Sequence, residues 1–404
     1  MLFIHSLLLA VASAYPIFQG LNNTELDDGI SSSNTSIFSN FNSTASNSSV
    51  HIVNNAVEMR VKSYSYAEFP ITYEGVAYFI DAQVGSNKDT VRMLFDTGSS
   101  YTWVRSSDMC DNASTDCSGY GSYDYEKSTT MKDKKKELRL SYGDGSWYDT
   151  EVVTDSFWLG DYQFSNQYLE LDKDSWSSIG GLMALSINVR SKQLISKFQK
   201  VFNTQKQGFS VYLGPKESNF NGSLLFGAID YDKIDGNFTA LKLTNWRNQY
   251  KGATNWTVAS RGISYDGKTI VDQTYPAMLD TGTTNLGVPT AVWENITSTF
   301  GATEENGNWV LDCPSNDKNL TFYFDNNLSI NVEASSLVDT YGDKCYFDGI
   351  NDNGPVGYIL GDSFMRYSYV YHDAHKDAIM MGQAKYSNTK NIKIMTEDVD
   401  AIHP

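Results

Sequence analysis

Two short stretches of this chain could each deliver an acidic side chain from a tight turn at the end of an apolar strand. They read Met93-Leu94-Phe95-Asp96-Thr97-Gly98-Ser99-Ser100 and Ala277-Met278-Leu279-Asp280-Thr281-Gly282-Thr283-Thr284. Each copy has three apolar residues before the Asp and two hydroxyl residues after the Gly. The copies stand roughly half a chain apart, which predicts an internal repeat.

Two such carboxyl groups suit acid–base chemistry. The end of a strand aims the side chain, and Gly98 and Gly282 let backbone approach it closely. Two carboxylates brought face to face cannot both ionise, so the pair holds one proton over a wide pH range. One member is then a base and the other an acid, as the activation of a water molecule requires. We therefore expect Asp96 and Asp280 to be catalytic, with no metal ion and no other cofactor.

The elements that would position these residues are mostly strands. Residues 76–84 and 90–95 are dense in β-branched and aromatic residues and are bounded by Gly85-Ser86-Asn87, as two strands joined by a turn should be. A further hairpin is predicted around Gly143-Asp144-Gly145, because Asp-Gly favours the tight turns that join antiparallel strands.

From residue 62 onward the chain resembles the pepsin family of aspartic proteases, most closely the secreted enzymes of yeasts. The first repeat runs on into Tyr101-Thr102-Trp103-Val104, as in the family's first active-site segment. Three later segments, in the family's order, resemble its flap, its interlobe hinge and the motif beneath its second Asp. They are Tyr142-Gly143-Asp144-Gly145-Ser146, Phe226-Gly227-Ala228-Ile229-Asp230 and Ile359-Leu360-Gly361-Asp362-Ser363-Phe364.

The resemblance implies an all-β, bilobal fold in which two lobes related by a pseudo-two-fold axis enclose an active-site cleft. The lobes would span residues 63–235 and 236–404, a division that also suits the length of the chain. Helical periodicity is convincing only in short stretches such as 191–201 and 290–300.

The resemblance also implies roles for the hydroxyl residues of both repeats. Thr97 and Thr281 would form hydrogen bonds across the lobe junction, while Ser99 and Thr283 would bond the outer carboxylate oxygens. Ordinary turn chemistry is the alternative explanation for all four, because Ser and Thr favour turns.

In the flap, Tyr142 would pack on the substrate and reach Trp103, and Asp144 would contact the substrate backbone. Gly143 and Gly145 would let this lid bend and exclude water from the reaction.

The chain departs from the family's pattern at three positions. Gly180 stands where the family usually has an acidic residue, and Ala184 and Ala228 stand where it has glycine. A methyl group at residue 184 could shift the strand beneath Asp96, so these departures bear on activity more than on fold.

The start of the chain predicts secretion. Residues 1–14 read as a signal peptide, and residues 15–62 are rich in Asn and Ser, so they cannot bury enough apolar surface to fold alone. The latter segment is either a removed propeptide or a disordered, glycosylated arm. Arg60-Val61-Lys62 is the nearest processing candidate, but it equally fits a strand because Val57, Met59 and Val61 alternate with charged residues.

Four cysteines in a chain with a signal peptide suggest two disulfides, with three possible connectivities. The family's pairing would join Cys110 to Cys117 and Cys313 to Cys345. Acceptor sequons for N-glycosylation stand at Asn22, Asn34, Asn42, Asn47, Asn112, Asn221, Asn237, Asn255, Asn295, Asn319 and Asn327.

The net charge of -17 excludes nucleic acid as a natural partner and fits either an enzyme that works in acid or simple solubility. The tail is polar and gives no lipid-anchor signal, and the basic run at residues 132–136 predicts a solvated turn.

We expect a secreted, extracellular monomer without a membrane anchor. It would act on protein and peptide substrates and prefer bulky apolar residues at the cut.

Three other interpretations compete with a broad protease. A pepsin-like binding or cell-wall glycoprotein would usually have lost an active-site Asp, Gly or flap Tyr, and this chain keeps all of them. His372 and His375 have a spacing seen in metal sites, but their surroundings resemble the family's last structural strands. An enzyme dedicated to one precursor would differ from a broad protease only in the shape of its subsites.

Overall fold

Strands dominate this protein because apolar residues recur at alternate positions along much of the chain. In β22 (Ser329–Glu333), for example, Ile330 and Val332 are buried, while the residues between and beside them are exposed. The computed structural model describes residues 48–53, 56–61, 64–110, 117, 119–143, 145–174, 179–216, 222–244, 255–353 and 358–396.

The chain forms two units, one containing Ser65–Pro404 and the other Pro16–Tyr64. In the smaller unit, β1 (Ser48–Val53) and β2 (Ala56–Val61) form an antiparallel hairpin in which Ser48 pairs with Val61. Of the two alternatives for this stretch, the strand indicated by the alternation at Val57, Met59 and Val61 is therefore present. The role of residues 15–62 as a propeptide stays a prediction.

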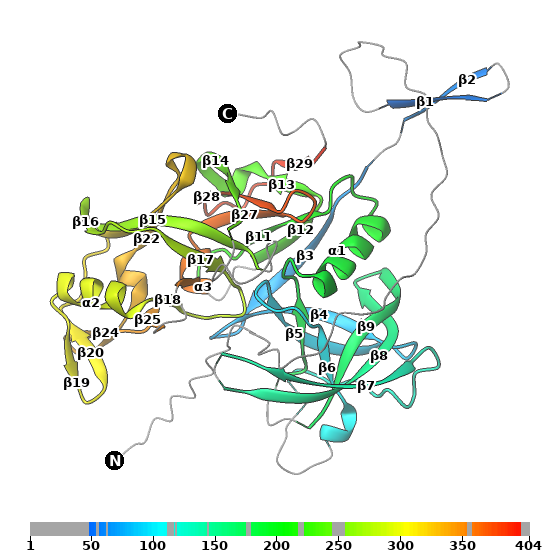
Figure 1. Ribbon diagram of the computed structural model, residues 1–404, viewed down its shortest axis with the longest axis horizontal. Helices are drawn as coiled ribbons and strands as arrows, with labels where there is room; N and C mark the ends of the chain where they lie inside the picture. Colours follow the sequence, from blue (N-terminus) through cyan, green and yellow to red (C-terminus); the bar gives the residue numbers. More distant parts are fainter. Residues whose placement is uncertain are drawn as a thin grey trace. The chain divides into compact units, whose positions relative to one another are not determined.

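In the larger unit, the largest sheet of the described residues has 13 strands (Figure 1). In order across the sheet they are β14 (Ile234–Lys242), β28 (Ala378–Ala384), β27 (Ser368–Asp373), β11 (Gly208–Tyr212), β12 (Gly222–Phe226), β3 (Ala67–Tyr73), β4 (Tyr78–Val84), β5 (Asp89–Asp96), β10 (Gly181–Ala184), β6 (Trp103–Arg105), β9 (Tyr162–Asp174), β8 (Trp147–Leu159) and β7 (Lys132–Ser141). The sheet holds strands from both predicted lobes, so strand pairing does not separate the lobes at residue 235. That division stays a prediction.

The second major sheet holds the other repeat. Its strands are β22, β21 (Asn319–Phe324), β15 (Thr257–Tyr265), β17 (Tyr275–Leu279), β26 (Tyr358–Leu360), β18 (Leu286–Val288) and β25 (Ile350–Asp352), with β16 (Lys268–Val271) paired to β15. A four-stranded sheet contains β19 (Thr303–Glu305), β20 (Asn308–Leu311), β24 (Lys344–Phe347) and β23 (Val338–Tyr341), and β13 (Ala228–Asp230) pairs with β29 (Ile392–Ile394). Two major sheets confirm the predicted all-β, bilobal fold class.

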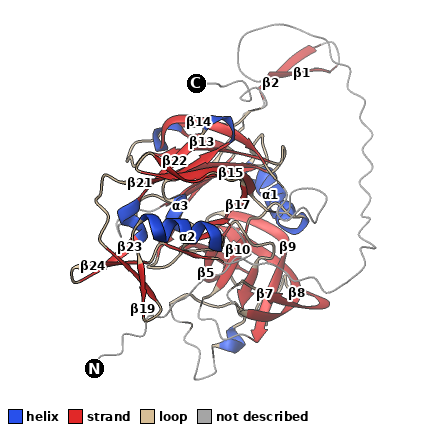
Figure 2. Ribbon diagram, turned by 60° about the vertical axis from the view of Figure 1, so that its left-hand side comes forward, coloured by secondary structure: helices blue, strands red, loops and turns tan. Residues whose placement is uncertain are grey.

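Helices are short. They are α1 (Val189–Phe202), α2 (Thr290–Thr299) and α3 (Asp362–Met365), with 3-10 turns η1 (Ser107–Met109), η2 (Tyr231–Lys233), η4 (Asp325–Asn327) and η5 (Ala334–Leu337). The helices predicted at 191–201 and 290–300 are thus confirmed. Figures 1 and 2 show α2 with β19 on one side of this unit and the strands β7 to β9 on another. In the described part of the chain, no helix is long and apolar enough to cross a membrane.

The two disulfides of the described residues join Cys110 to Cys117 and Cys313 to Cys345, the pairing that the resemblance implied. The first closes a loop after β6 and η1. The second ties the residues after β20 to β24, so it crosslinks the four-stranded sheet.

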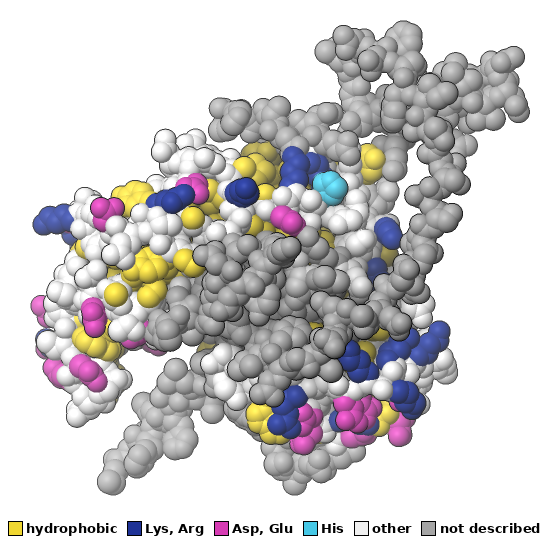
Figure 3. Space-filling model, viewed as in Figure 1, with side chains coloured by type: hydrophobic (Ala, Val, Ile, Leu, Met, Phe, Trp, Pro, Cys, Tyr) yellow, Lys and Arg dark blue, Asp and Glu magenta, His cyan; other side chains and the backbone are white. Residues whose placement is uncertain are grey.

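The basic run at residues 132–136 is the beginning of β7, so the predicted turn was wrong. The strand lies at an edge of the 13-stranded sheet, where its lysines reach solvent, and its register with β8 shifts between Asp133 and Glu137. Acidic neighbours balance the charge: Lys135 pairs with Asp133 at 2.5 Å, and Arg139 pairs with Asp149. Figure 3 shows this mixture of basic and acidic side chains at the lower right.

Candidate active site

Asp96 and Asp280 occupy matching places in the two major sheets. β5 ends at Asp96, and β17 ends at Leu279, one residue before Asp280. Each of these strands has a parallel neighbour, β10 beside β5 and β26 beside β17. The apolar residues that precede each aspartate are buried, and both aspartates are themselves 0% exposed. The repeat in the sequence is therefore a repeat of structure.

The two turns approach one another so closely that each glycine lies against the opposite carboxyl group. A Cβ atom at Gly98 would lie 2.5 Å from Cγ of Asp280, and one at Gly282 would lie 2.4 Å from Cγ of Asp96. Real Cβ atoms do not approach other atoms at such distances. A residue with a Cβ atom would not fit at either position, so glycine is required at both. The close approach of the two turns brings the carboxyl groups together in one buried site.

Each carboxyl group receives hydrogen bonds from its own turn. The backbone N–H groups of Gly98 and Ser99 donate to Oδ1 of Asp96 at 2.7 and 2.8 Å, and the Ser99 hydroxyl donates to Oδ2. In the second turn, Gly282 N–H donates to Oδ1 of Asp280 and the Thr283 hydroxyl donates to Oδ2, both at 2.9 Å. These donors fix the orientation of both side chains.

Thr97 and Thr281 link the two turns reciprocally. The backbone N–H of each donates to the hydroxyl oxygen of the other at 3.1 Å. The Thr97 hydroxyl then donates to the Leu279 carbonyl, and the Thr281 hydroxyl to the Phe95 carbonyl at 2.8 Å. Ordinary turn chemistry would keep these bonds within one turn, whereas all four cross from one repeat to the other.

Burial raises the pKa of both carboxyl groups, and the charge of Asp280 raises the pKa of Asp96 further. The donors named above act in the opposite direction because they stabilise the ionised forms. Two carboxyl groups so close together cannot both ionise, so the pair keeps a proton at a pH where a solvated carboxyl group would have lost it. The site can therefore supply one acid and one base.

The predicted flap is the hairpin of β7 and β8. Tyr142 N–H donates to the Ser146 carbonyl, and Gly145 N–H donates to the Tyr142 carbonyl, which closes the turn after Gly143. Asp144 lies outside the described residues. Trp103 Nε1–H donates to the Tyr142 hydroxyl oxygen at 2.7 Å, so the predicted contact between them is present.

Tyr148 completes an aromatic group with these two residues. Its ring lies 4.4 Å from that of Trp103 and 5.3 Å from that of Tyr142, measured between centroids. Burial is the main reason that the pKa of the Tyr142 hydroxyl is raised, with Tyr148 and Asp96 adding to it. Tyr142 therefore keeps its proton and stays a hydrogen-bond donor as well as an acceptor.

The structure gives a reason for the departure at Gly180. A Cβ atom there would lie 2.3 Å from the Tyr120 carbonyl oxygen and 3.0 Å from those of Arg92 and Gly121. An acidic side chain would not fit in this chain. Ala184 does fit: it is fully buried opposite Asp96, and the next residue, Leu185, still donates its N–H to the Asp96 carbonyl at 2.8 Å.

Asp362 lies within the segment that resembles the motif beneath the second Asp, but sequence reasoning gave this residue no role of its own. It is fully buried, and among the described residues neither of its carboxyl oxygens has a hydrogen-bond partner. Burial raises its pKa, Arg366 lowers it, and Asp280 and Asp96 raise it. An acidic residue at the end of an apolar strand, in Leu360-Gly361-Asp362, was the signal that could have identified it.

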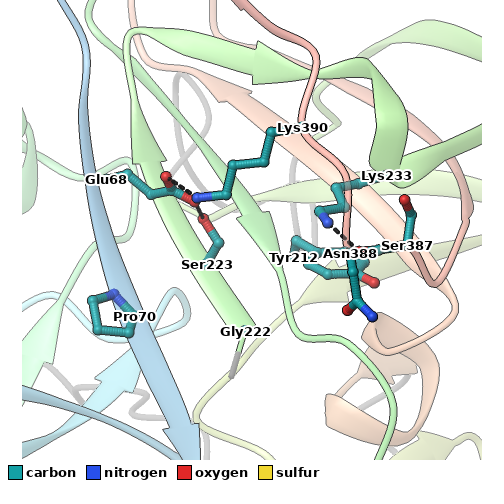
Figure 4. Close-up of a pocket in the computed structure, with 9 residues that line it drawn as sticks. All are labelled: Glu68, Pro70, Tyr212, Gly222, Ser223, Lys233, Ser387, Asn388 and Lys390. Atoms are coloured by element: carbon teal, nitrogen blue, oxygen red, sulfur yellow. Dashed lines mark hydrogen bonds and ion pairs between the residues drawn. The ribbon is translucent and has the colours of Figure 1, made fainter. Parts of the chain in front are cut away.

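A separate hollow of about 390 Å³ lies away from these residues, at β3, β11 and β12 (Figure 4). Its polar groups mostly bond one another: Lys390 pairs with Glu68 at 2.6 Å, and Ser223 donates to the same carboxylate. Lys233 Nζ donates to the Ser387 and Thr389 carbonyls. These bonds therefore hold the segment before β29 against the sheet, and the charged groups of the hollow already have partners.

Comparisons with known proteins agree on one family. A family model described as eukaryotic aspartyl protease matches residues 77–384. An acid protease of Saccharomycopsis fibuligera is 30% identical over 327 residues, which are 76% of this chain and 81% of that protein. Rhizopuspepsin-1 of Rhizopus niveus is 31% identical over 314 residues, 74% of this chain and 77% of that protein. Secreted aspartic protease 8 of Candida albicans is 29% identical over 337 residues, with 80% and 79% covered.

Proposed function

Because the chain belongs to the eukaryotic aspartyl protease family and is thus an aspartic-type protease, we propose that Asp96 and Asp280 are its catalytic pair. One observation carries this assignment: Gly98 and Gly282 each lie against the carboxyl group of the opposite repeat. A pair so constructed holds one proton between two buried carboxyl groups.

In the reaction, the two aspartates hold a water molecule between them. The ionised carboxylate takes a proton from the water as its oxygen attacks the peptide carbonyl, and the protonated carboxyl group donates its proton to the carbonyl oxygen. The resulting tetrahedral intermediate collapses when the leaving nitrogen is protonated. The Thr97–Thr281 bonds and the Ser99 and Thr283 hydroxyls serve this step by holding the carboxyl groups in place.

The flap hairpin is the proposed lid over the substrate. Tyr142, held by Trp103, would pack on the bound peptide, and closure of the hairpin would exclude water from the reaction. We further propose that the substrates are proteins and peptides with bulky apolar residues at the cut. Secretion is supported by the signal-like start of the chain and by relatives whose names describe secreted proteases.

The test is hydrolysis of an acid-denatured protein from about pH 2 to about pH 8 by the full chain expressed for secretion. Asp96→Asn and Asp280→Asn should each lower kcat by at least about 1,000-fold, since either change removes the shared proton chemistry. Asp272→Asn is the matched control, because this carboxyl group is exposed and lies eight positions before Asp280 in the chain.

A statine-type inhibitor, which mimics the tetrahedral intermediate, should abolish the activity of the unchanged enzyme. N-terminal sequencing of the active species would locate any processing between residues 15 and 62. A folded, processed sample without activity at any pH would contradict the catalytic assignment and favour a binding glycoprotein.

A further inference from the structure

Trp256 lies beneath both proposed catalytic turns and is hydrogen-bonded to each side of the site. Its indole Nε1–H donates to the Leu185 carbonyl at 2.7 Å, and Leu185 N–H donates to the Asp96 carbonyl. The Trp256 carbonyl accepts from the N–H of Leu279, the residue before Asp280, at 2.9 Å. One fully buried residue therefore joins the strand under Asp96 to the strand that carries Asp280.

His372 packs on this tryptophan in the hydrophobic core. Its ring lies 4.8 Å from the Trp256 ring at an interplanar angle of 74°, and it stacks on Phe209 at 4.6 Å and 11°. The side chain is fully buried, and neither ring nitrogen has a hydrogen-bond partner among the described residues. A protonated imidazole would thus be a charge without a counter-charge, packed against the indole.

We propose that Trp256 is a positioning residue for the catalytic pair, and that His372, packed against its indole, makes this positioning sensitive to acid. The inference rests on the proposed function, because it takes Asp96 and Asp280 as the catalytic residues. Protonation of His372 would place an uncompensated charge in the core, which burial disfavours. Because His372 packs on the indole, this charge disturbs the residue that bonds to both strands under the aspartates.

Among the described residues, no neighbouring charge compensates a proton on His372. β11 places Phe209 opposite it and β28 places Ile379 opposite it, while Tyr371 and Asp373 flank it on its own strand, where successive side chains point to opposite faces. Burial lowers the pKa of His372 to about 3, and only the Phe209 backbone opposes this shift. An ordinary histidine has a pKa near 6.5.

The sign of the pH dependence follows from these values. As the pH falls below about 6.5, the unfolded chain binds a proton at this histidine and the folded chain does not. The unfolding equilibrium constant therefore rises up to about tenfold for each pH unit down to about pH 3, where the folded protein also becomes protonated. For an enzyme that works in acid, this residue sets a lower limit on the usable pH.

The first experiment needs no catalysis. His372→Phe keeps an aromatic ring on Phe209 but cannot titrate, so it is made in the inactive Asp280→Asn background and unfolded with urea at several pH values. Between about pH 6.5 and about pH 4, the unfolding constant of the His372 form should rise by about 100-fold or more relative to the Phe form. Equal pH dependence of the two forms would overturn the acid-sensing part of the proposal, whether or not the catalytic assignment is right.

The second experiment tests positioning in the active enzyme. Trp256→Phe keeps an aromatic ring but removes the indole donor to Leu185, and it should lower kcat by about tenfold with little change in KM. Trp293→Phe is the matched control, since Trp293 is also buried but packs on Trp309 and Phe347. An equal effect of both changes, or an effect on KM alone, would overturn the positioning role.

If Trp256→Phe does not fold, His372→Phe made in the active enzyme still tests whether the positioning by Trp256 is sensitive to acid. Its activity should persist to a pH at least about one unit lower than that of the unchanged enzyme, with the acid-induced change in tryptophan fluorescence shifted by the same amount. An unchanged acid limit would contradict the proposal. Activity that survives Asp280→Asn, with the expected stability difference intact, would instead point to a failure of the catalytic assignment.

Discussion

The backbone of Gly98 lies against the side chain of Asp280, although the two residues stand 182 positions apart in the chain. The Thr97 hydroxyl bonds the Leu279 carbonyl over the same separation. A Cβ atom at Gly98 would meet the Asp280 carboxyl group at 2.5 to 2.7 Å. Gly282 meets the Asp96 carboxyl group in the same way. Each glycine therefore lines the part of the site that holds the carboxyl group of the opposite repeat.

We expect Gly98→Ala to lower kcat by at least about 100-fold, because the added methyl group must push the carboxyl group of Asp280 out of line. Gly282→Ala should act alike on Asp96. The measurement is kcat against a peptide substrate, together with a thermal unfolding curve that shows whether the fold survives.

Gly119→Ala is the control, since no heavy atom would lie within 4 Å of a Cβ atom there. If Gly98→Ala retained nearly full activity in a folded protein, the close approach of the two turns would not be needed for the reaction.

The stability of the protein should also report on the shared proton. Both carboxyl groups have a raised pKa, so the folded protein keeps a proton that the unfolded chain loses above about pH 4. The pair therefore contributes stability in acid that is lost as the pH rises through the raised pKa. Asp280→Asn removes one of the two charges and should raise Tm by roughly 3 °C or more at pH 7.

The same change should give little or no gain near pH 3, where both groups are protonated in either state. Asp272→Asn, at an exposed position, should leave Tm nearly unchanged at both pH values. A loss of stability in Asp280→Asn at pH 7 would show that the two carboxyl groups do not repel one another there.

The Trp103–Tyr142 hydrogen bond should matter to substrate binding more than to the fold. Trp103→Phe and Tyr142→Phe each break it, and each should lower kcat/KM by about 3- to 10-fold. Because both remove the same bond, the double variant should lose less than the product of the two factors. The measurement is kcat/KM for four enzymes, which are the unchanged protein, the two single variants and the double variant.

Trp309→Phe serves as a control because this ring packs on Trp293, in the second half of the chain. Strictly multiplicative losses in the double variant would indicate that the two flap residues act independently.

Local pattern was enough to predict the strands and helices that present these residues. The β-branched and aromatic residues and the turn at 76–95 gave β4 and β5 to within two residues, and helical periodicity gave α1 and α2 equally closely. The approach of Asp96 to Asp280 followed only from the repeat, because spacing along the chain says nothing of contact. Which residues are catalytic still awaits the experiments above.

Three features depended on tertiary contacts that no local pattern contains. β27 pairs with β11 across 159 to 165 positions, so neither strand identifies the other. Gly180 was interpreted as a departure from a family pattern, whereas the Tyr120 carbonyl leaves no room for a side chain there. Trp256 stands in a glycosylation sequon, and nothing around it in the sequence indicates its bonds to both turns.

The two disulfides should differ in their contribution to stability. Cys313 and Cys345 are separated by 32 positions, and Cys110 and Cys117 by seven. A longer closed loop restricts the unfolded chain more, so loss of the second disulfide should cost about 3–4 kcal/mol and loss of the first about 2–3 kcal/mol. Urea unfolding of Cys313→Ala/Cys345→Ala and Cys110→Ala/Cys117→Ala, compared at one pH, gives both values. A smaller cost for the 313–345 pair would mean that the four-stranded sheet keeps its structure in the unfolded ensemble or relaxes when the crosslink is removed.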